Sequence, residues 1–127
     1  MGILGRATES NDDKANNALR KILIDGEQVQ ASFILYRDRF VFTNMRLVIL
    51  NSMGVGKEHS YRSIPYDMIS TFEIRTRSLA GIDSVLTIWL VGDTQNGIEL
   101  KFGDDDSIYK VQQVLATYCL GAALSPQ

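Results

Sequence analysis

Apolar and polar residues alternate with a period of two over most of the chain between residues 29 and 102. Glycine, proline, asparagine and aspartate cluster between the alternating segments, where tight turns need them. Short alternating segments separated by such turns are typical of antiparallel sheets. The pattern therefore predicts seven strands, near residues 29–35, 39–43, 46–51, 58–64, 71–75, 84–91 and 98–102.

Two segments follow a helical period instead. Between Asn11 and Gly26, apolar residues recur at Ala15, Ala18, Leu19, Ile22 and Leu23. After Gly103, a stripe begins that comprises Ile108, Val111, Leu115, Tyr118, Cys119 and Ala122. We expect a mainly β fold, a seven-stranded antiparallel barrel or sandwich with a short N-terminal helix and a C-terminal α-helix that covers an open end. The predicted domain spans residues 12–122, with a flexible lead at 1–11 and a tail at 123–127.

Length and charge narrow the class of protein. A chain of 127 residues forms one domain and buries a core without a metal or disulfide. The net charge of −2 favours neither nucleic acid nor an anionic membrane surface. The N-terminal residues do not resemble a signal peptide, and no run reaches the roughly 20 apolar residues of a spanning helix. The single cysteine, Cys119, excludes an internal disulfide, so we expect a cytoplasmic protein.

Catalytic motifs are missing from the sequence. His59 is the only histidine and lies in a polar segment, and Cys119 falls on the apolar stripe of the last helix. The acidic run at residues 104–106 precedes that helix, where carboxylates cap free N–H groups. We therefore predict a protein that is not an enzyme and that holds no cofactor and no metal ion.

The segment from Phe40 to Leu50 predicts a β-hairpin, with two apolar runs on either side of a polar break. Phe42-Thr43-Asn44 and Arg46-Leu47 of this segment, with Arg37-Asp38 just before it, resemble the hairpin of the small, single-domain bacterial pleckstrin-homology-like (PH-like) proteins. Three further segments fit the same family in order and spacing: Gly54-Val55-Gly56-Lys57, Ser63-Ile64-Pro65-Tyr66 and Trp89. The resemblance covers residues 19–120. One departure is the loop at residues 76–83, where Arg77, together with Arg75 just before the loop, adds positive charge to a stretch that is usually acidic.

The resemblance implies a PH-like barrel and a particular assembly. Members of this family form dome-shaped cyclic rings, five-fold for the single-domain kind, that act as platforms for protein–protein interaction. We therefore expect a cyclic homo-oligomer that presents a polar surface to a protein partner, and no nucleic-acid ligand.

The strand at 84–91 supports assembly independently, because it is apolar on both faces. A sheet with one face in water should alternate apolar with polar residues. One interpretation is that a neighbouring copy covers Leu86, Ile88 and Leu90. The other is that the N-terminal helix or adjacent strands of the same chain cover them.

Charged and polar residues at or near the first two turns of the sheet are the candidates for a binding surface: Arg37, Asp38, Arg39, Asn44, Arg46 and Lys57. They could serve the hairpin structurally or contact a partner. An alternative function is a peripheral membrane module that binds anionic lipid headgroups through Arg37, Arg39 and Lys57. We favour the protein-interaction role, because the full basic pattern of lipid-binding relatives is missing.

Overall fold

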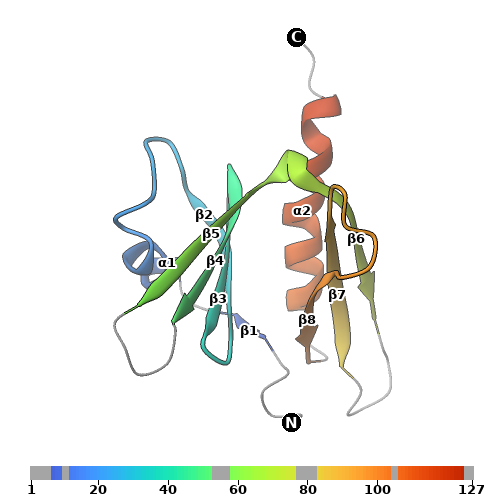
Figure 1. Cartoon of the computed structure of the whole chain (residues 1–127), viewed down its shortest axis with the longest axis horizontal. Helices are drawn as coiled ribbons and strands as arrows, with labels where there is room; N and C mark the ends of the chain where they lie inside the picture. Colours follow the sequence, from blue (N-terminus) through green and yellow to red (C-terminus); the bar gives the residue numbers. More distant parts are fainter. Residues whose placement is uncertain (1–6, 10–11, 53–57, 77–82, 104–105, 125–127) are drawn as a thin grey trace.

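The computed structural model describes residues 7–9, 12–52, 58–76, 83–103 and 106–124, and Figure 1 shows the arrangement of its elements. In chain order they are β1 (Thr8–Glu9), α1 (Asp12–Ala18), β2 (Val29–Leu35), β3 (Asp38–Thr43), β4 (Arg46–Ser52), β5 (His59–Pro65), a 3₁₀ helix (Tyr66–Met68), β6 (Ile69–Arg75), β7 (Ser84–Leu90), β8 (Ile98–Phe102) and α2 (Ser107–Leu124). The seven predicted strands and both predicted helices are confirmed. Residues 53–57, most of the 76–83 loop and Asp104 and Asp105 lie outside the described residues.

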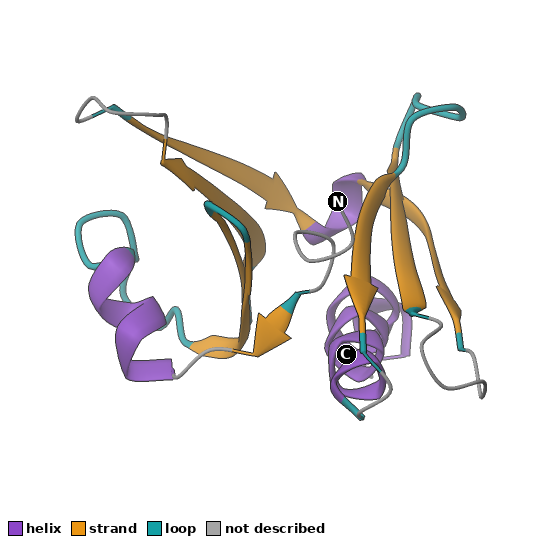
Figure 2. Cartoon of the chain, turned by 90° about the horizontal axis from the view of Figure 1, so that it is seen from below, coloured by secondary structure: helices purple, strands orange, loops and turns teal. Residues whose placement is uncertain are grey.

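The strands form two antiparallel sheets. One has the order β1-β2-β3-β4-β5 and the other has the order β6-β7-β8, so neighbours in the chain are neighbours in each sheet. Figure 2 shows the sheets as two separate layers, with α2 lying along the β6-β7-β8 layer. This is the mainly β sandwich with a C-terminal helix that the hydrophobic pattern predicted.

The main core lies between the two sheets and α2. Its centre is the ring of Phe33 on β2, which meets Phe42 and Phe102 edge-on at centroid distances of 6.2 and 5.2 Å. Because Phe102 belongs to β8, this contact joins the two sheets. Helix α2 adds the fully buried residues of its apolar stripe, Ile108, Val111 and Leu115. Burying a side chain of this size stabilises the fold by about 1.5–3 kcal/mol.

A second, smaller core lies on the other face of the first sheet. Ala15 and Leu19 pack there against Val41, Val48 and Leu50 of β3 and β4, and all five are buried. The N-terminal segment therefore covers the outer face of β4, which explains why that strand is apolar on both faces.

Helix α1 ends earlier than its apolar stripe predicted. It stops at Ala18, and the next hydrogen bonds include the tighter contact from the Ile22 N–H to the Leu19 carbonyl at 2.9 Å. Such bonds tighten the end of a helix into turns. Ile22 and Leu23 still pack against the second core, so the apolar period continues although the helix does not.

The lead at residues 1–11 contains an ordered segment that the sequence pattern did not predict. Thr8 and Glu9 pair with Ile34 and Phe33 of β2, and the Ala7 N–H donates to the Lys101 carbonyl of β8 at 2.6 Å. Residues 7–9 therefore link the edge of one sheet to the edge of the other. The predicted lead thus includes three residues whose backbone hydrogen bonds are made within the fold.

Candidate functional site

The β3–β4 turn is closed by the side chain of Thr43, which is fully buried. The backbone N–H groups of Met45 and Arg46 both donate to Thr43 Oγ1, each at 3.0 Å. The Thr43 carbonyl accepts a hydrogen bond of 2.6 Å from the hydroxyl of Tyr66, whose ring stacks on Tyr118 of α2. Burial raises the pKa of Tyr66, so its phenol stays protonated and can donate. The turn is thereby anchored to α2 through one tyrosine.

A buried ion pair connects this turn to the loop before β2. Arg46 Nε and Nη2 donate to the two oxygens of Glu27 at 2.8 and 2.9 Å. Arg46 also donates to the Ile22 carbonyl at 2.7 Å and to Ser63 Oγ at 2.8 Å, and Thr43 Oγ1 donates to Glu27 at 2.8 Å. We call the pair of Glu27 and Arg46 with its Thr43 contact the hairpin clamp. Its bidentate form is the strongest geometry available to arginine and a carboxylate.

The electrostatics of the hairpin clamp follow from that geometry. The Glu27 side chain has no exposed surface and that of Arg46 is 21% exposed. The hydrogen bond to Arg46 lowers the pKa of Glu27 against the opposing effect of burial, and the same contact raises the pKa of Arg46. Both groups are therefore charged at neutral pH.

Asn44 ties the same turn to the same loop. Its Oδ1 accepts from the Gln28 N–H at 2.7 Å, and its Nδ2 donates to the Gly26 carbonyl at 3.0 Å. Gly26 has φ of +82°, a conformation that favours glycine. With all these bonds made inside the chain, Asn44 and Arg46 serve the hairpin structurally. The structure supports the structural alternative for Asn44 and Arg46, and their place on a binding surface stays a prediction.

The sequence pattern did not mark Glu27 as a residue with a functional or structural role. It lies 19 positions before Arg46 in an irregular segment, so no local period marks it. The only available signal was a carboxylate next to Gly26, just before a strand.

The remaining basic candidates lie at the opposite end of β3. Tyr36 and Arg37 form the β2–β3 turn and Asp38 begins β3, and this six-residue strand separates the turn from Arg46 by about 20 Å. Tyr36 adopts a left-handed φ of +58°, and the Arg37 guanidinium lies 5.5 Å from the centre of its ring. The structure therefore does not bring Arg46 together with Arg37 and Arg39, and Lys57 lies outside the described residues.

A cavity of about 200 Å³ opens beside this turn. It is lined by residues of both signs together with apolar ones: Ala18, Ile34, Tyr36, Arg37, Asp38, Arg39 and Leu50. Asp38 accepts a short hydrogen bond from the side-chain amide of Asn51, and Arg39 donates to Ser32 Oγ at 3.5 Å. The mixed lining and these contacts give Asp38 and Arg39 structural roles in addition to any binding role.

The prediction that a neighbouring copy covers Leu86, Ile88 and Leu90 is wrong for the first two residues. Leu86 and Ile88 have no exposed surface in the single chain, because they face the main core. Leu90 is partly buried against the same core, and its role in assembly stays untested. The alternative interpretation, that the chain itself covers this face, explains the two buried residues.

Strand edges offer another contact surface. Among the described residues, β5 ends the first sheet and β6 begins the second, and neither has a partner on its outer side. Residues His59 to Ser63 of β5 are all exposed. β6 has a shift in its pairing between Ile69 and Thr71, where Ser70 is the extra residue. Such bulges protect an edge, whereas β5 pairs with β4 without a register shift over this exposed stretch.

Chemically reactive groups are few in the described part of the chain. Burial raises the pKa of Cys119 to about 11, so its thiol stays protonated at neutral pH and packs beside the core. No group of three or more metal-ligating side chains occurs among the described residues. Within those residues, no helix has both the length and the apolar character that crossing a bilayer requires.

Comparison with known proteins relates this chain to a family of bacterial domains. A family model described as bacterial PH domain matches residues 1–119. The uncharacterized protein YjqA of Bacillus subtilis (strain 168) is 39% identical over 120 residues, which cover 94% of this chain and 96% of that protein. The uncharacterized protein YozO of the same strain is 29% identical over 118 residues, which cover 93% of this chain and 97% of that protein.

Solved structures agree with the family model. A DUF1696 family protein with a pleckstrin-homology domain from Shewanella loihica PV-4 superposes with a TM-score of 0.79 at 33% identity, covering 91% of this chain and 99% of that one. A pleckstrin homology domain from Shewanella amazonensis SB2B gives a TM-score of 0.70 at 33% identity, covering 87% and 100%. The chain therefore belongs to the bacterial PH domain family, and the two sheets with their C-terminal helix are its pleckstrin-homology-like fold.

Proposed function

We propose that this bacterial PH domain is a non-enzymatic interaction module that assembles into a cyclic homo-oligomer, as a ring of five copies, and presents a polar surface to a protein partner. The observation that carries the proposal is the exposed outer edge of β5 from Ser60 to Ser63, where β5 is the last strand of its sheet. An edge of this length offers a row of N–H and C=O groups to a strand of another chain. A contact between this edge and an unlike surface of the next copy would be head-to-tail, the type that closes into a ring when the rotation between copies permits.

The backbone geometry of β5 shows where this contact can be tested. Pro65 has no N–H, so it belongs at a position whose N–H would point away from β4. The period of two then directs the N–H groups of Ser63 and Tyr61 to the free edge as well. Proline at Tyr61 would remove one edge donor and leave the ladder to β4 intact.

Size-exclusion chromatography with light scattering tests the ring. We expect the full chain at tens of micromolar to elute as one species with five times the 14.2 kDa mass of a single chain. Tyr61→Pro should shift this species to the monomer while keeping its circular dichroism spectrum. Tyr61→Ala, which removes the 42% exposed side chain but keeps the N–H, is the matched control and should still assemble. A wild-type chain that is strictly monomeric would contradict the proposed ring.

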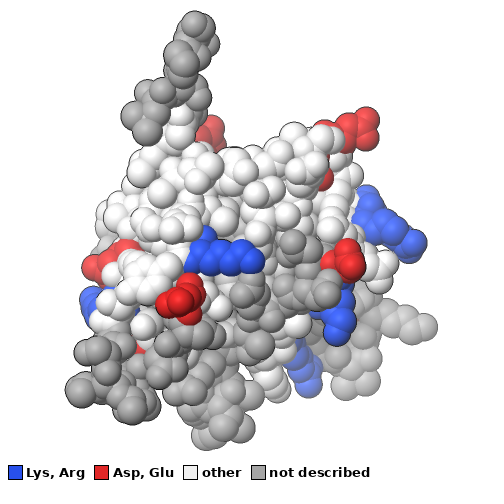
Figure 3. Space-filling model, turned by 180° about the vertical axis from the view of Figure 1, so that it is seen from behind, with Lys and Arg blue, Asp and Glu red and all other residues white. Residues whose placement is uncertain are grey.

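Binding of anionic lipid headgroups remains the second candidate. Its support is that Arg37 and Arg39 line one cavity at the β2–β3 turn. The mixed charge weighs against lipid binding, because Asp38 lies between the two arginines in the cavity lining. Acidic and basic residues are also interspersed on the face of the molecule that Figure 3 shows. If this candidate is right, the protein co-sediments with vesicles containing phosphatidylserine at low salt. Binding should then fall several-fold in Arg37→Ala or Arg39→Ala and at 0.5 M salt. No co-sedimentation at low salt would eliminate it.

A further inference from the structure

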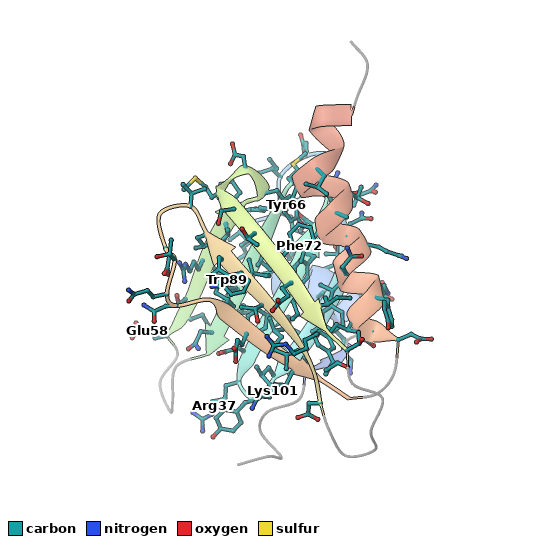
Figure 4. All side chains as sticks on the ribbon, turned by 90° about the vertical axis from the view of Figure 1, so that its right-hand side faces the viewer. Arg37, Glu58, Tyr66, Phe72, Trp89 and Lys101 are labelled. Carbon is teal, nitrogen blue, oxygen red and sulfur yellow. The ribbon has the colours of Figure 1, made fainter. Side chains whose placement is uncertain are left out.

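A second cavity, of about 310 Å³, lies on the outer face of the β6-β7-β8 sheet. It is lined by Ser70, Thr71, Trp89, Asp93 and Thr94. Trp89 alternates along β7 with the core residues Ile88 and Leu90, so its side chain is on the face directed away from the core. Figure 4 looks at this sheet and labels Trp89 on it. The hairpin clamp and the β2–β3 turn both belong to the other sheet, so neither of them forms this site.

The bulge in β6 builds one wall of this cavity. Ile69 pairs with Leu90 and Thr71 pairs with Trp89, which leaves Ser70 as an extra residue between the two pairs. In a regular strand Ser70 and Thr71 would point to opposite faces. The bulge instead lets both residues line the cavity, and Ser70 Oγ donates to the Trp89 carbonyl at 3.2 Å.

The indole ring of Trp89 forms the next wall and is held from the other side by Gly97. A Cβ atom at residue 97 would lie only 3.1 Å from the indole nitrogen and 2.5 Å from a methyl carbon of Thr87. Only glycine therefore leaves room for the indole to lie across the start of β8. The ring is positioned by the backbone on one side and lines the cavity on the other.

The charge at the site is negative. Asp93 Oδ1 accepts hydrogen bonds from the N–H groups of Gln95 and Asn96 at 3.1 and 2.9 Å, and these bonds lower the pKa of the Asp93 carboxyl. The turn therefore holds an ionised carboxylate beside the indole. Ser70, Thr71 and Thr94 add hydroxyl groups that can accept hydrogen bonds.

The surrounding rows of the sheet strengthen this charge. Glu73 and Glu99 flank Thr87 in the row next to Trp89, about 7 Å away along the strands. Among the described residues of this sheet face, the basic ones are Arg75 and Lys101. They lie one row further, about 14 Å from Trp89, which exceeds the screening length of about 8–10 Å in physiological salt. Arg75 also contacts Glu73 at 3.5 Å, but both side chains are about half exposed, so this contact neutralises little.

We propose that this cavity binds a basic side chain, arginine or lysine, of a partner protein. The cation would lie against the face of the Trp89 indole and beside the Asp93 carboxylate, where both the ring and the carboxylate attract positive charge. The identity of the ligand as a protein side chain rests on the proposed interaction function. The site is complete within one chain, however, so it does not depend on the ring.

Intrinsic fluorescence tests this directly, because Trp89 is the only tryptophan in the chain. The probe is a blocked Gly-Arg-Gly-Arg-Gly peptide at low ionic strength, and the comparison peptide replaces arginine with the uncharged citrulline. We expect a saturable change in Trp89 emission with the arginine peptide and a much weaker response to the citrulline peptide. Asp93→Asn should raise the dissociation constant roughly fivefold. Asparagine keeps the Oδ1 acceptor of the turn, so this variant should fold.

A control variant tests whether the loss is specific to Asp93. Asp25→Asn makes the same chemical change at an exposed carboxylate before β2 and should alter the dissociation constant by less than about twofold.

A second probe, choline chloride, supplies a free organic cation in place of a protein side chain. A response to choline without one to the arginine peptide would overturn the assignment to a protein side chain. Equal responses to the arginine and citrulline peptides, or no saturable response to any probe, would overturn the cation site. A chain that binds the peptide as a monomer would keep this inference and remove the ring.

Discussion

Arg46→Ala is expected to lower the free energy of unfolding by about 3 kcal/mol, near the lower end of the cost of breaking a buried ion pair. The substitution leaves the Glu27 carboxylate without its bidentate partner at a site with no solvent exposure. The loss stays near the lower end because the Thr43 hydroxyl and the Ile24 N–H still donate to Glu27, at 2.8 and 3.2 Å. Urea denaturation followed by circular dichroism measures it. The melting temperature should fall by roughly 10 °C.

A matched control shows whether the loss of stability in Arg46→Ala is specific to Arg46 or follows from removing any arginine that contacts a glutamate. Arg75 also contacts a glutamate, at 3.5 Å, but its side chain is 61% exposed and that of Glu73 is 49% exposed. Arg75→Ala should therefore change the free energy of unfolding by less than about 0.5 kcal/mol. Arg46→Lys keeps the charge without the planar fork and should fall between the two. A loss below about 1 kcal/mol for Arg46→Ala would contradict the structural role of the hairpin clamp.

The hairpin clamp also explains why the sequence resemblance predicts a fold and not an activity. Thr43, Asn44 and Arg46 are the residues of the hairpin that resemble the family, and all three are occupied in tying the β3–β4 turn to residues 22–28. A motif used inside the chain identifies the architecture. The Trp89 cavity instead depends on the bulge at Ser70 and on Gly97, and neither residue belongs to the hairpin motif.

The strands and the last helix could be predicted because their signals are local. A period of two with turn residues at each end marks every long strand, and the spacing of Ile108, Val111 and Leu115 places them on one face of α2. All three are buried in the structure. Their prediction needed no knowledge of what they would pack against.

Features that depend on distant residues could not be predicted. Strand β1 is two residues long, and its pairing with β2 uses backbone groups that carry no sequence pattern. β7 is apolar on both faces, so its sequence alone could not show that Leu86 and Ile88 face the core. The bulge at Ser70 is likewise a property of how β6 pairs with β7. Each of these depends on which elements meet in the folded chain.

Phe33→Ala should have the largest effect of any single substitution proposed for this protein, a loss of about 4 kcal/mol in the free energy of unfolding. Phe33 is fully buried and makes edge-on contacts with Phe42 and Phe102. Alanine would leave a cavity where the two sheets and α2 meet, and it would remove both aromatic contacts. A small domain has only about 5–15 kcal/mol of total stability. We therefore expect a melting temperature lower by roughly 15 °C in a thermal scan.

Two companion variants make this result specific to the junction of the sheets. Phe33→Leu keeps most of the apolar volume and should cost less than about 2 kcal/mol. Tyr109→Ala removes an aromatic side chain that is 46% exposed on α2, and it should change stability by less than about 1 kcal/mol. If Phe33→Ala were no more destabilising than Tyr109→Ala, the two sheets could not share the core that Phe33 and Phe102 form. The close packing of β2 against β8 would then be wrong, and with it the position of the residue 7–9 segment that links their edges.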